Sequence, residues 1–113
     1  MHEAGLAVAV AEVLREGPVE GARVRLLVSG GHAAAADFDA SFRFHLAAAA
    51  PDLAAVAIEI VHLASDRLCA GCGATFAAAG TEEPCPSCGG SGLPIPTLER
   101  VEIELERPGA IGP

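Results

Sequence analysis

The stretch Cys69-Ala70-Gly71-Cys72 is followed, after a spacer of twelve residues, by Cys85-Pro86-Ser87-Cys88, and the two stretches contain all four cysteines of the chain. Two residues between the cysteines of a pair allow both thiolates to bind one metal ion, and a second pair completes a tetrahedral site with Zn–S distances of about 2.3 Å. The spacing therefore predicts a zinc ribbon in which Cys69, Cys72, Cys85 and Cys88 bind Zn²⁺. Four protein ligands leave no open coordination position, so the predicted role of this zinc is structural.

The residues around each pair of cysteines support two tight turns. Gly73 and Gly89 follow directly after the pairs, at positions where a tight turn often needs a positive φ. Pro86 fixes the backbone inside the second turn. The spacer is shorter than the 15–20 residues of the common pattern, but it is long enough for a short hairpin.

Four cysteines in two pairs have other uses, and one of them stays open here. Two disulfides would suit a secreted chain, but Met1-His2-Glu3 offers no basic region of the kind that begins a signal peptide. A dithiol redox centre needs only one Cys-x-x-Cys pair, so it leaves the second pair unexplained. An iron site of the rubredoxin type uses similar knuckles and remains the alternative metal site.

The charge of the chain separates the remaining classes of function. Seven basic residues, all arginine, stand against fifteen acidic ones, which gives a net charge of −8. No basic residue lies between Cys69 and Cys88, while Glu82-Glu83 does. This balance argues against a surface that binds the phosphates of nucleic acids. A zinc-ribbon binding module associated with nucleic acid or transcription is therefore only the alternative function. No apolar run approaches the roughly twenty residues of a membrane span. We expect a cytoplasmic protein without nucleic-acid or membrane partners, and not an enzyme, because a closed zinc site and scattered histidines form no catalytic constellation.

Two segments show helical periodicity. The range 4–16 carries Leu6, Val10 and Leu14 at helical spacing, and Gly17-Pro18 ends it. The second predicted helix begins with Asp37 as its N-cap and runs to Ala50, before Pro51. Its apolar stripe consists of Phe38, Phe42, Leu46 and Ala49. Because three of the four phenylalanines lie in this segment, we expect it to supply much of the core.

Three segments are predicted as strands, at 22–29, 53–63 and 100–106, and the last alternates most regularly, with its glutamates toward water. Since a helix connects the first two strands, we expect them to be parallel. The predicted fold is α/β (α+β), with two helices on a small three-stranded mixed sheet and an inserted zinc-ribbon lobe. The predicted domains are 1–67 plus 93–113, and the ribbon at 68–92.

The chain resembles the HypA/HybF family of hydrogenase nickel-insertion proteins. The likeness rests on the Met1-His2-Glu3 start and on the acidic turn and aromatic helix at 37–44. It rests also on the Cys-x-x-Cys…Cys-Pro-x-Cys-Gly ribbon and the acidic strand near 98–106. It covers nearly the whole chain. The resemblance implies a nickel metallochaperone that binds Ni²⁺ at its amino terminus and holds structural Zn²⁺ in the ribbon.

The resemblance also implies partners, namely a HypB-type GTPase and the large subunit of a [NiFe]-hydrogenase, with the chain itself a monomer or weak homodimer. The predicted nickel site consists of Met1, His2 and Glu3. Nickel(II) favours a square-planar field of nitrogen ligands, and the His2 imidazole forms a chelate ring with its own backbone nitrogen. The terminal amine or neighbouring amides complete the plane, and Glu3 contributes chiefly its backbone nitrogen. The other histidines, His32, His45 and His62, are the remaining candidates if nickel binds elsewhere.

Overall fold

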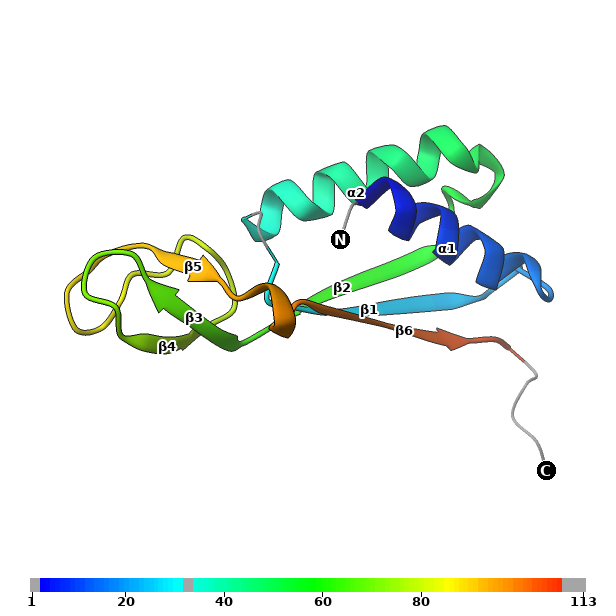
Figure 1. Cartoon of the computed structure of the whole chain (residues 1–113). Coiled ribbons are helices and arrows are strands. Elements are labelled where there is room, and N and C mark those ends of the chain that lie inside the picture. Colours follow the sequence, from blue (N-terminus) through cyan, green and yellow to red (C-terminus); the bar gives the residue numbers. More distant parts are fainter. Residues whose placement is uncertain (1–2, 32–33, 109–113) are drawn as a thin grey trace, which may run out of the picture.

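The computed structural model describes residues 3–31 and 34–108, which form a body of two helices on one sheet and a smaller lobe around a second sheet (Figure 1). The elements are, in chain order, α1 (Glu3–Arg15), β1 (Arg23–Ser29), α2 (Ala35–Ala49), the 3₁₀ helix η1 (Pro51–Leu53), β2 (Ala57–Leu63), β3 (Ser65–Cys69), β4 (Thr75–Ala78), β5 (Gly92–Pro94), the 3₁₀ helix η2 (Pro96–Leu98) and β6 (Arg100–Glu106). This arrangement confirms the predicted mixed α/β class with two helices and a small mixed sheet. None of the helices in the described ranges is long and apolar enough to cross a membrane.

The sheet of the main body has the strand order β2-β1-β6. As predicted, β1 and β2 are parallel, while β6 returns antiparallel to β1. The register places Leu26 of β1 opposite Ile60 of β2 and Ile103 of β6. Since side chains alternate along a strand, this register sends one apolar row from each strand to the same face of the sheet.

The core of the main body lies between that apolar face and the two helices, which cover the same side of the sheet (Figure 1). From the helices it contains Leu6, Val10, Leu14, Phe38, Phe42 and Leu46. Each of these side chains contributes about 1.5–3 kcal/mol when it leaves water completely. The opposite face of the sheet carries the arginines of β1 and the glutamates of β6.

Helix α2 corrects two details of the sequence prediction. Its N-cap residue is Ala34, which makes no side-chain capping hydrogen bond, so the prediction that Asp37 is the N-cap was wrong. The alanines before Asp37 have the highest helix propensity and carry the helix one turn further back. Asp37 then lies in the first turn, where its negative charge interacts favourably with the helix dipole. Ala49, predicted on the buried stripe, is exposed, and Ala50 is buried instead.

The second predicted strand was too long at its start. Instead of extending from Leu53, the chain forms η1, and β2 begins at Ala57. Pro51 suits the first turn of a helix because its fixed φ matches it and its missing N–H is not needed there. Hydrogen bonds to carbonyl oxygens three residues earlier continue from Leu53 N to Val56 N. The Leu53 side chain is 1% exposed, so this turn is anchored in the core.

The smaller lobe is inserted between β2 and β6 and contains the antiparallel sheet β4-β3-β5. Its strands run from Ser65 to Pro94, slightly beyond the predicted ribbon range of 68–92. Its inner face is built around Arg67, which is only 1% exposed. The guanidinium donates to the carbonyl oxygens of Gly31 at 3.1 Å and Ala78 at 3.4 Å. Arg67 thus joins the lobe to the loop that follows β1.

Gly30 and Gly17 leave room for close contacts at the two ends of the main body. Gly30 has a φ of 71°, and a Cβ there would lie 2.7 Å from the Leu98 carbonyl oxygen, so no other residue fits. At the far end of the sheet, Arg107 reaches back to the last turn of α1. Its Nη2 donates to the carbonyl oxygens of Val13 at 2.9 Å and Leu14 at 3.1 Å. A Cβ on Gly17 would lie 3.0 Å from the Arg107 Cζ.

Candidate metal centre

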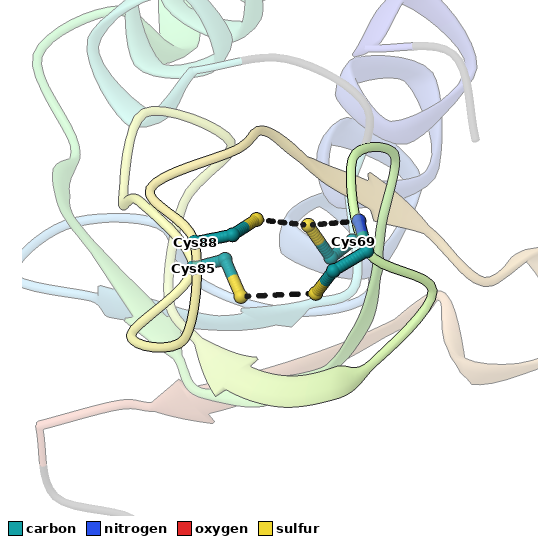
Figure 2. Close-up of side chains that lie close together, drawn as sticks. Cys69, Cys85 and Cys88 are labelled. Carbon is teal, nitrogen blue, oxygen red and sulfur yellow. Dashed lines mark hydrogen bonds between the residues drawn. The ribbon is translucent and has the colours of Figure 1, made fainter.

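The fold brings the four cysteines together at the tip of the smaller lobe. Cys69 ends β3 and Cys72 lies in the turn toward β4, whereas Cys85 and Cys88 lie in the loop between β4 and β5. All four sulfur atoms lie within 4.8 Å of one another. Figure 2 shows the thiols of the two turns facing each other, with Cys69 Sγ 3.4 Å from Cys88 Sγ and Cys72 Sγ 3.9 Å from Cys85 Sγ. A tetrahedral zinc site with Zn–S bonds of 2.3 Å places its sulfurs roughly 3.8 Å apart, so the cluster has the size that one such ion requires.

The two turns that hold these cysteines have the same backbone geometry. Gly73 and Gly89 adopt φ values of 76° and 77°, which confirms the predicted positive-φ positions. Gly73 N donates to the Cys69 carbonyl at 3.0 Å, and Gly89 N donates to the Cys85 carbonyl at 2.8 Å. Each Cys-x-x-Cys-Gly segment is therefore a closed turn that fixes the direction of its two side chains.

Backbone N–H groups point at the sulfurs from both turns. The N–H groups of Gly71 and Cys72 donate to Cys69 Sγ at 3.3 and 3.4 Å, and Gly90 N donates to Cys88 Sγ at 3.4 Å. A Cβ on Gly90 would lie 3.0 Å from Cys69 Sγ, so this glycine lets the two turns approach. Hydrogen bonds of this kind stabilise a thiolate relative to a thiol.

The contacts of Cys69 and Cys88 shift the pKa values of these two neighbouring thiols in opposite directions. The Cys72 N–H lowers the pKa of Cys69, and despite burial, which raises it, the pKa of Cys69 falls to about 6. The Gly90 N–H lowers the pKa of Cys88, but the sulfurs of Cys69 and Cys72 together outweigh it and raise that pKa to about 12. The close pair Cys69–Cys88 thus titrates as one coupled system, in which Cys69 is the more acidic thiol.

The donor set decides which metals suit the cluster. Cys69 and Cys85 are 2% and 3% exposed, whereas Cys72 and Cys88 are exposed, so each turn contributes one buried and one exposed cysteine. Four thiolates in a tetrahedral arrangement favour zinc or iron over hard cations that prefer oxygen ligands. The cluster is therefore compatible with zinc. The binding of zinc itself remains a prediction, and the rubredoxin-like iron site stays its alternative.

The predicted nickel ligands fall only partly within the described residues. Met1 and His2 lie outside them. Glu3 is the first residue of α1 and is half-buried. The first four N–H groups of an α-helix have no acceptor within the helix, so α1 itself makes no use of the Glu3 backbone nitrogen. In residues 3–31 and 34–108, the four cysteines are the one group of three or more His, Cys, Asp or Glu side chains close enough to share a metal ion.

Two other histidines have contacts that the sequence did not suggest. His62 Nε2 lies 2.7 Å from Asp39 Oδ1, and its ring packs edge-on against Phe38 at 5.6 Å between centroids. This pair ties the end of β2 to α2 and gives His62 a structural role. The sequence signal for the contact between His62 and Asp39 is the parallel crossover β1-α2-β2, which places the end of β2 beside the start of α2. His45 packs against Phe44, and His32 lies outside the described residues.

A hollow of about 720 Å³ lies on the uncovered face of the main sheet, lined by Arg23, Val24, Arg25, Ala57, Ile58, Glu59, Glu104, Leu105 and Glu106. It is not part of the cysteine cluster. Three of its charged groups pair with one another, since Arg25 lies 3.7 Å from both Glu59 and Glu104. Because they do not converge on a common point, we assign no binding site there.

Comparison with known proteins assigns no family to the chain. No family model, curated protein or solved structure matches the chain.

Proposed function

We propose that the chain is a nickel-delivery protein in which the four cysteines hold one structural Zn²⁺ and the amino terminus binds Ni²⁺ for insertion into a [NiFe]-hydrogenase. The observation that carries the proposal is the cluster of four thiols within 4.8 Å, built by two matching turns. Its sulfurs saturate one tetrahedral ion, so a second, transported metal needs a different donor set. The Met1-His2-Glu3 start supplies that set.

The chemistry of the two donor sets keeps the two metals apart. Zinc favours the tetrahedral thiolates of the lobe, whereas nickel(II) favours a square plane of nitrogen ligands. The terminal amine, the His2 imidazole and neighbouring backbone nitrogens form such a plane without any cysteine. Loading of one metal therefore leaves the ligands of the other unchanged.

The packing of α1 supports a site at this end of the chain. Leu6 and Ala7 are 4% and 0% exposed, so the helix is fixed to the core within its first turns. The proposed nickel ligands precede this fixed point by only a few residues. Release of a metal from ligands that precede this helix does not require the core to unfold.

The proposed partners follow from the resemblance to HypA/HybF proteins. They are a HypB-type GTPase, which takes part in nickel transfer, and the hydrogenase large subunit that receives the metal. Nickel transfer between such proteins needs a site that gives up its ion, and a terminus of few residues meets that need better than a closed cage.

A nickel titration of zinc-loaded protein tests the proposal. The native terminus should bind one Ni²⁺, while His2→Ala and a form with extra residues before Met1 should bind it far more weakly. His45→Ala is the matched control, because it removes an imidazole from α2 and leaves the terminus intact. Zinc content should be the same in all four proteins. Equal nickel affinity in all of them would move the site to another histidine and remove the main support for nickel delivery.

The alternatives predict different measurements. A rubredoxin-like protein would be red in its ferric form, while zinc is colourless. A nucleic-acid module would bind DNA or RNA with an affinity that falls steeply with salt. The exposed face of the second sheet presents Asp66, Leu68, Thr75, Ala77 and Leu93, which offers no cationic side chain for phosphate.

A further inference from the structure

The main sheet has two edge strands, and they differ in how their backbone is protected. The strand order β2-β1-β6 leaves one side of β2 and one side of β6 without a neighbouring strand. An edge strand presents unpaired N–H and C=O groups that can pair with another chain. The protection of each edge therefore decides where an additional strand can bind.

The β2 edge is partly blocked by α2. Arg43 Nη2 donates to the carbonyl oxygen of Ile58 at 3.0 Å, so a long side chain already lies along this edge and occupies one of its acceptors. For β6, no side chain or loop in residues 3–31 and 34–108 forms a hydrogen bond with the backbone of 100–106 beyond its pairing with β1. The seven residues of β6 also contain no proline and no bulge in their register.

The apolar side of β6 is incompletely covered. Val101, Ile103 and Leu105 are only partly buried. Their partners on β1 are sealed, with exposures of 5% for Val28, 0% for Leu26 and 3% for Val24. An added strand that places apolar side chains beside this row would remove further apolar surface from water, at about 25 cal/mol per Å².

The other side of β6 carries the charge. Glu102, Glu104 and Glu106 are all exposed and point to the uncovered face of the sheet. Glu104 is paired with Arg25 at 3.7 Å. Glu102 and Glu106 have no ion-pair partner in the described part of the chain. Cations on a neighbouring strand would lie directly across from these carboxylates, where opposite charges stabilise a strand pair.

We propose that β6 is a docking edge for an extended segment of another protein in which Lys or Arg alternates with Val, Ile or Leu. The apolar residues of that segment continue the row of Val101, Ile103 and Leu105, and its basic residues face the glutamates. A second copy of this chain fits poorly, because pairing of two β6 strands would place glutamates beside glutamates. The proposal does not depend on nickel binding.

The test uses the zinc-loaded full chain and two peptides of nine residues with blocked ends. One peptide alternates lysine with valine, and the other alternates glutamate with valine. The lysine peptide should bind and should slow hydrogen exchange at alternate amides of β6, and its affinity should fall as salt is added. The glutamate peptide should not bind.

The variant that tests the charges is Glu102→Lys with Glu106→Lys. Each exchange replaces an attractive cross-strand pair by a repulsive one, so binding of the lysine peptide should weaken by about tenfold or more. The matched control is Glu12→Lys with Glu16→Lys, which changes the net charge by the same amount on exposed positions of and just after α1. This control should keep most of the affinity. Circular dichroism and zinc content check that both variants are folded.

Four results would overturn the proposal. The first is that the lysine peptide fails to bind at low salt. The second is that both double variants weaken its binding equally, which would indicate attraction to net charge alone. The third is slowed exchange in α1, α2 or the smaller lobe in place of β6. Concentration-dependent protection of the same β6 amides in the protein alone would identify a second copy as the occupant and would equally contradict a basic partner strand.

Discussion

Replacement of Arg107 by methionine should destabilise the main body by a predictable amount. The Arg107 guanidinium lies across the end of α1, where it donates to the carbonyl oxygens of Val13, Leu14 and Pro18. The last four carbonyls of a helix have no partner within the helix, so this side chain, which follows β6 directly, caps α1 from 93 and 94 positions away in the sequence. Methionine keeps the apolar part of the side chain and removes the donors.

The magnitude follows from the number and exposure of these bonds. A buried hydrogen bond from a charged donor contributes about 1.5–3 kcal/mol, and a cation at a helix C-terminus adds about 0.3–1 kcal/mol. Arg107 is half-buried, so water replaces part of what is lost. We expect a loss of about 2 kcal/mol in the free energy of unfolding, which lowers the urea midpoint by about 1 M for an m-value near 2 kcal/mol/M. Arg100→Met, at the exposed first residue of β6, is the matched control and should change little.

Gly17 provides a second, sharper test of the same contact. A Cβ at this position would lie 3.0 Å from Arg107 Cζ, so Gly17→Ala shifts the guanidinium by a few tenths of an ångström and weakens the bonds it makes. Its cost is therefore bounded by that of Arg107→Met. In the Arg107→Met background the obstacle is absent. Gly17 has no positive φ, so alanine should then be neutral or stabilising by about 0.4–1 kcal/mol.

Urea unfolding, followed by the helical circular dichroism of zinc-loaded protein, measures all four members of this cycle. We expect a coupling between positions 17 and 107 of about 0.5 kcal/mol or more. Additive effects would show that Arg107 does not occupy the position described. An equal loss of stability in Arg100→Met would show that net charge, and not the cap of α1, is responsible.

Two further predictions concern the cysteine cluster. Cys72→Ser should reduce bound zinc from one ion per chain to none, because the binding energy of a structural zinc is folding energy. Amide protection should then be lost mainly across 65–94, while β1 and β6 stay protected. Metal analysis and hydrogen exchange measure both effects, and protection lost throughout the chain would contradict the prediction. Zinc affinity should fall with falling pH, and more steeply below about pH 6, because Cys69, whose pKa is lowered to about 6, is already ionised above that pH and releases no proton on binding. Proton release measured by calorimetry in buffers of different ionisation enthalpy should therefore increase as the pH falls through 6, and a constant proton count would contradict the ionisation assigned to Cys69.

The parts of this structure that could be predicted from the sequence depend on local rules. A Cys-x-x-Cys-Gly segment specifies its own turn, so Gly73 and Gly89 have the predicted positive φ. Strand β6 alternates between glutamates and apolar residues and has the predicted bounds, 100–106. The parallel order of β1 and β2 follows from the helix that connects them.

The parts that could not be predicted depend on contacts between distant residues. Ser65, Asp66 and Arg67 are three consecutive polar residues, yet Arg67 is the largest fully buried side chain of the described structure. Its partners, Gly31 and Ala78, lie 36 and 11 positions away, and no local pattern indicates them. Ala34 at the N-cap of α2 shows the same limit, because a run of alanines carries no boundary signal and packing decides where the helix begins.

The contact between Arg67 and Gly31 couples the folding of the smaller lobe to the backbone that follows β1. The guanidinium stays inside the smaller lobe only while that lobe is folded, and a metal ion in the cysteine cluster favours the folded lobe. Removal of the metal should therefore free the Arg67 guanidinium from the carbonyl oxygen of Gly31. By thermodynamic reciprocity, a partner that stabilises this contact should raise the affinity of the cluster for its metal. We therefore expect metal occupancy of the cluster to influence the backbone at Gly31 through the Arg67 side chain.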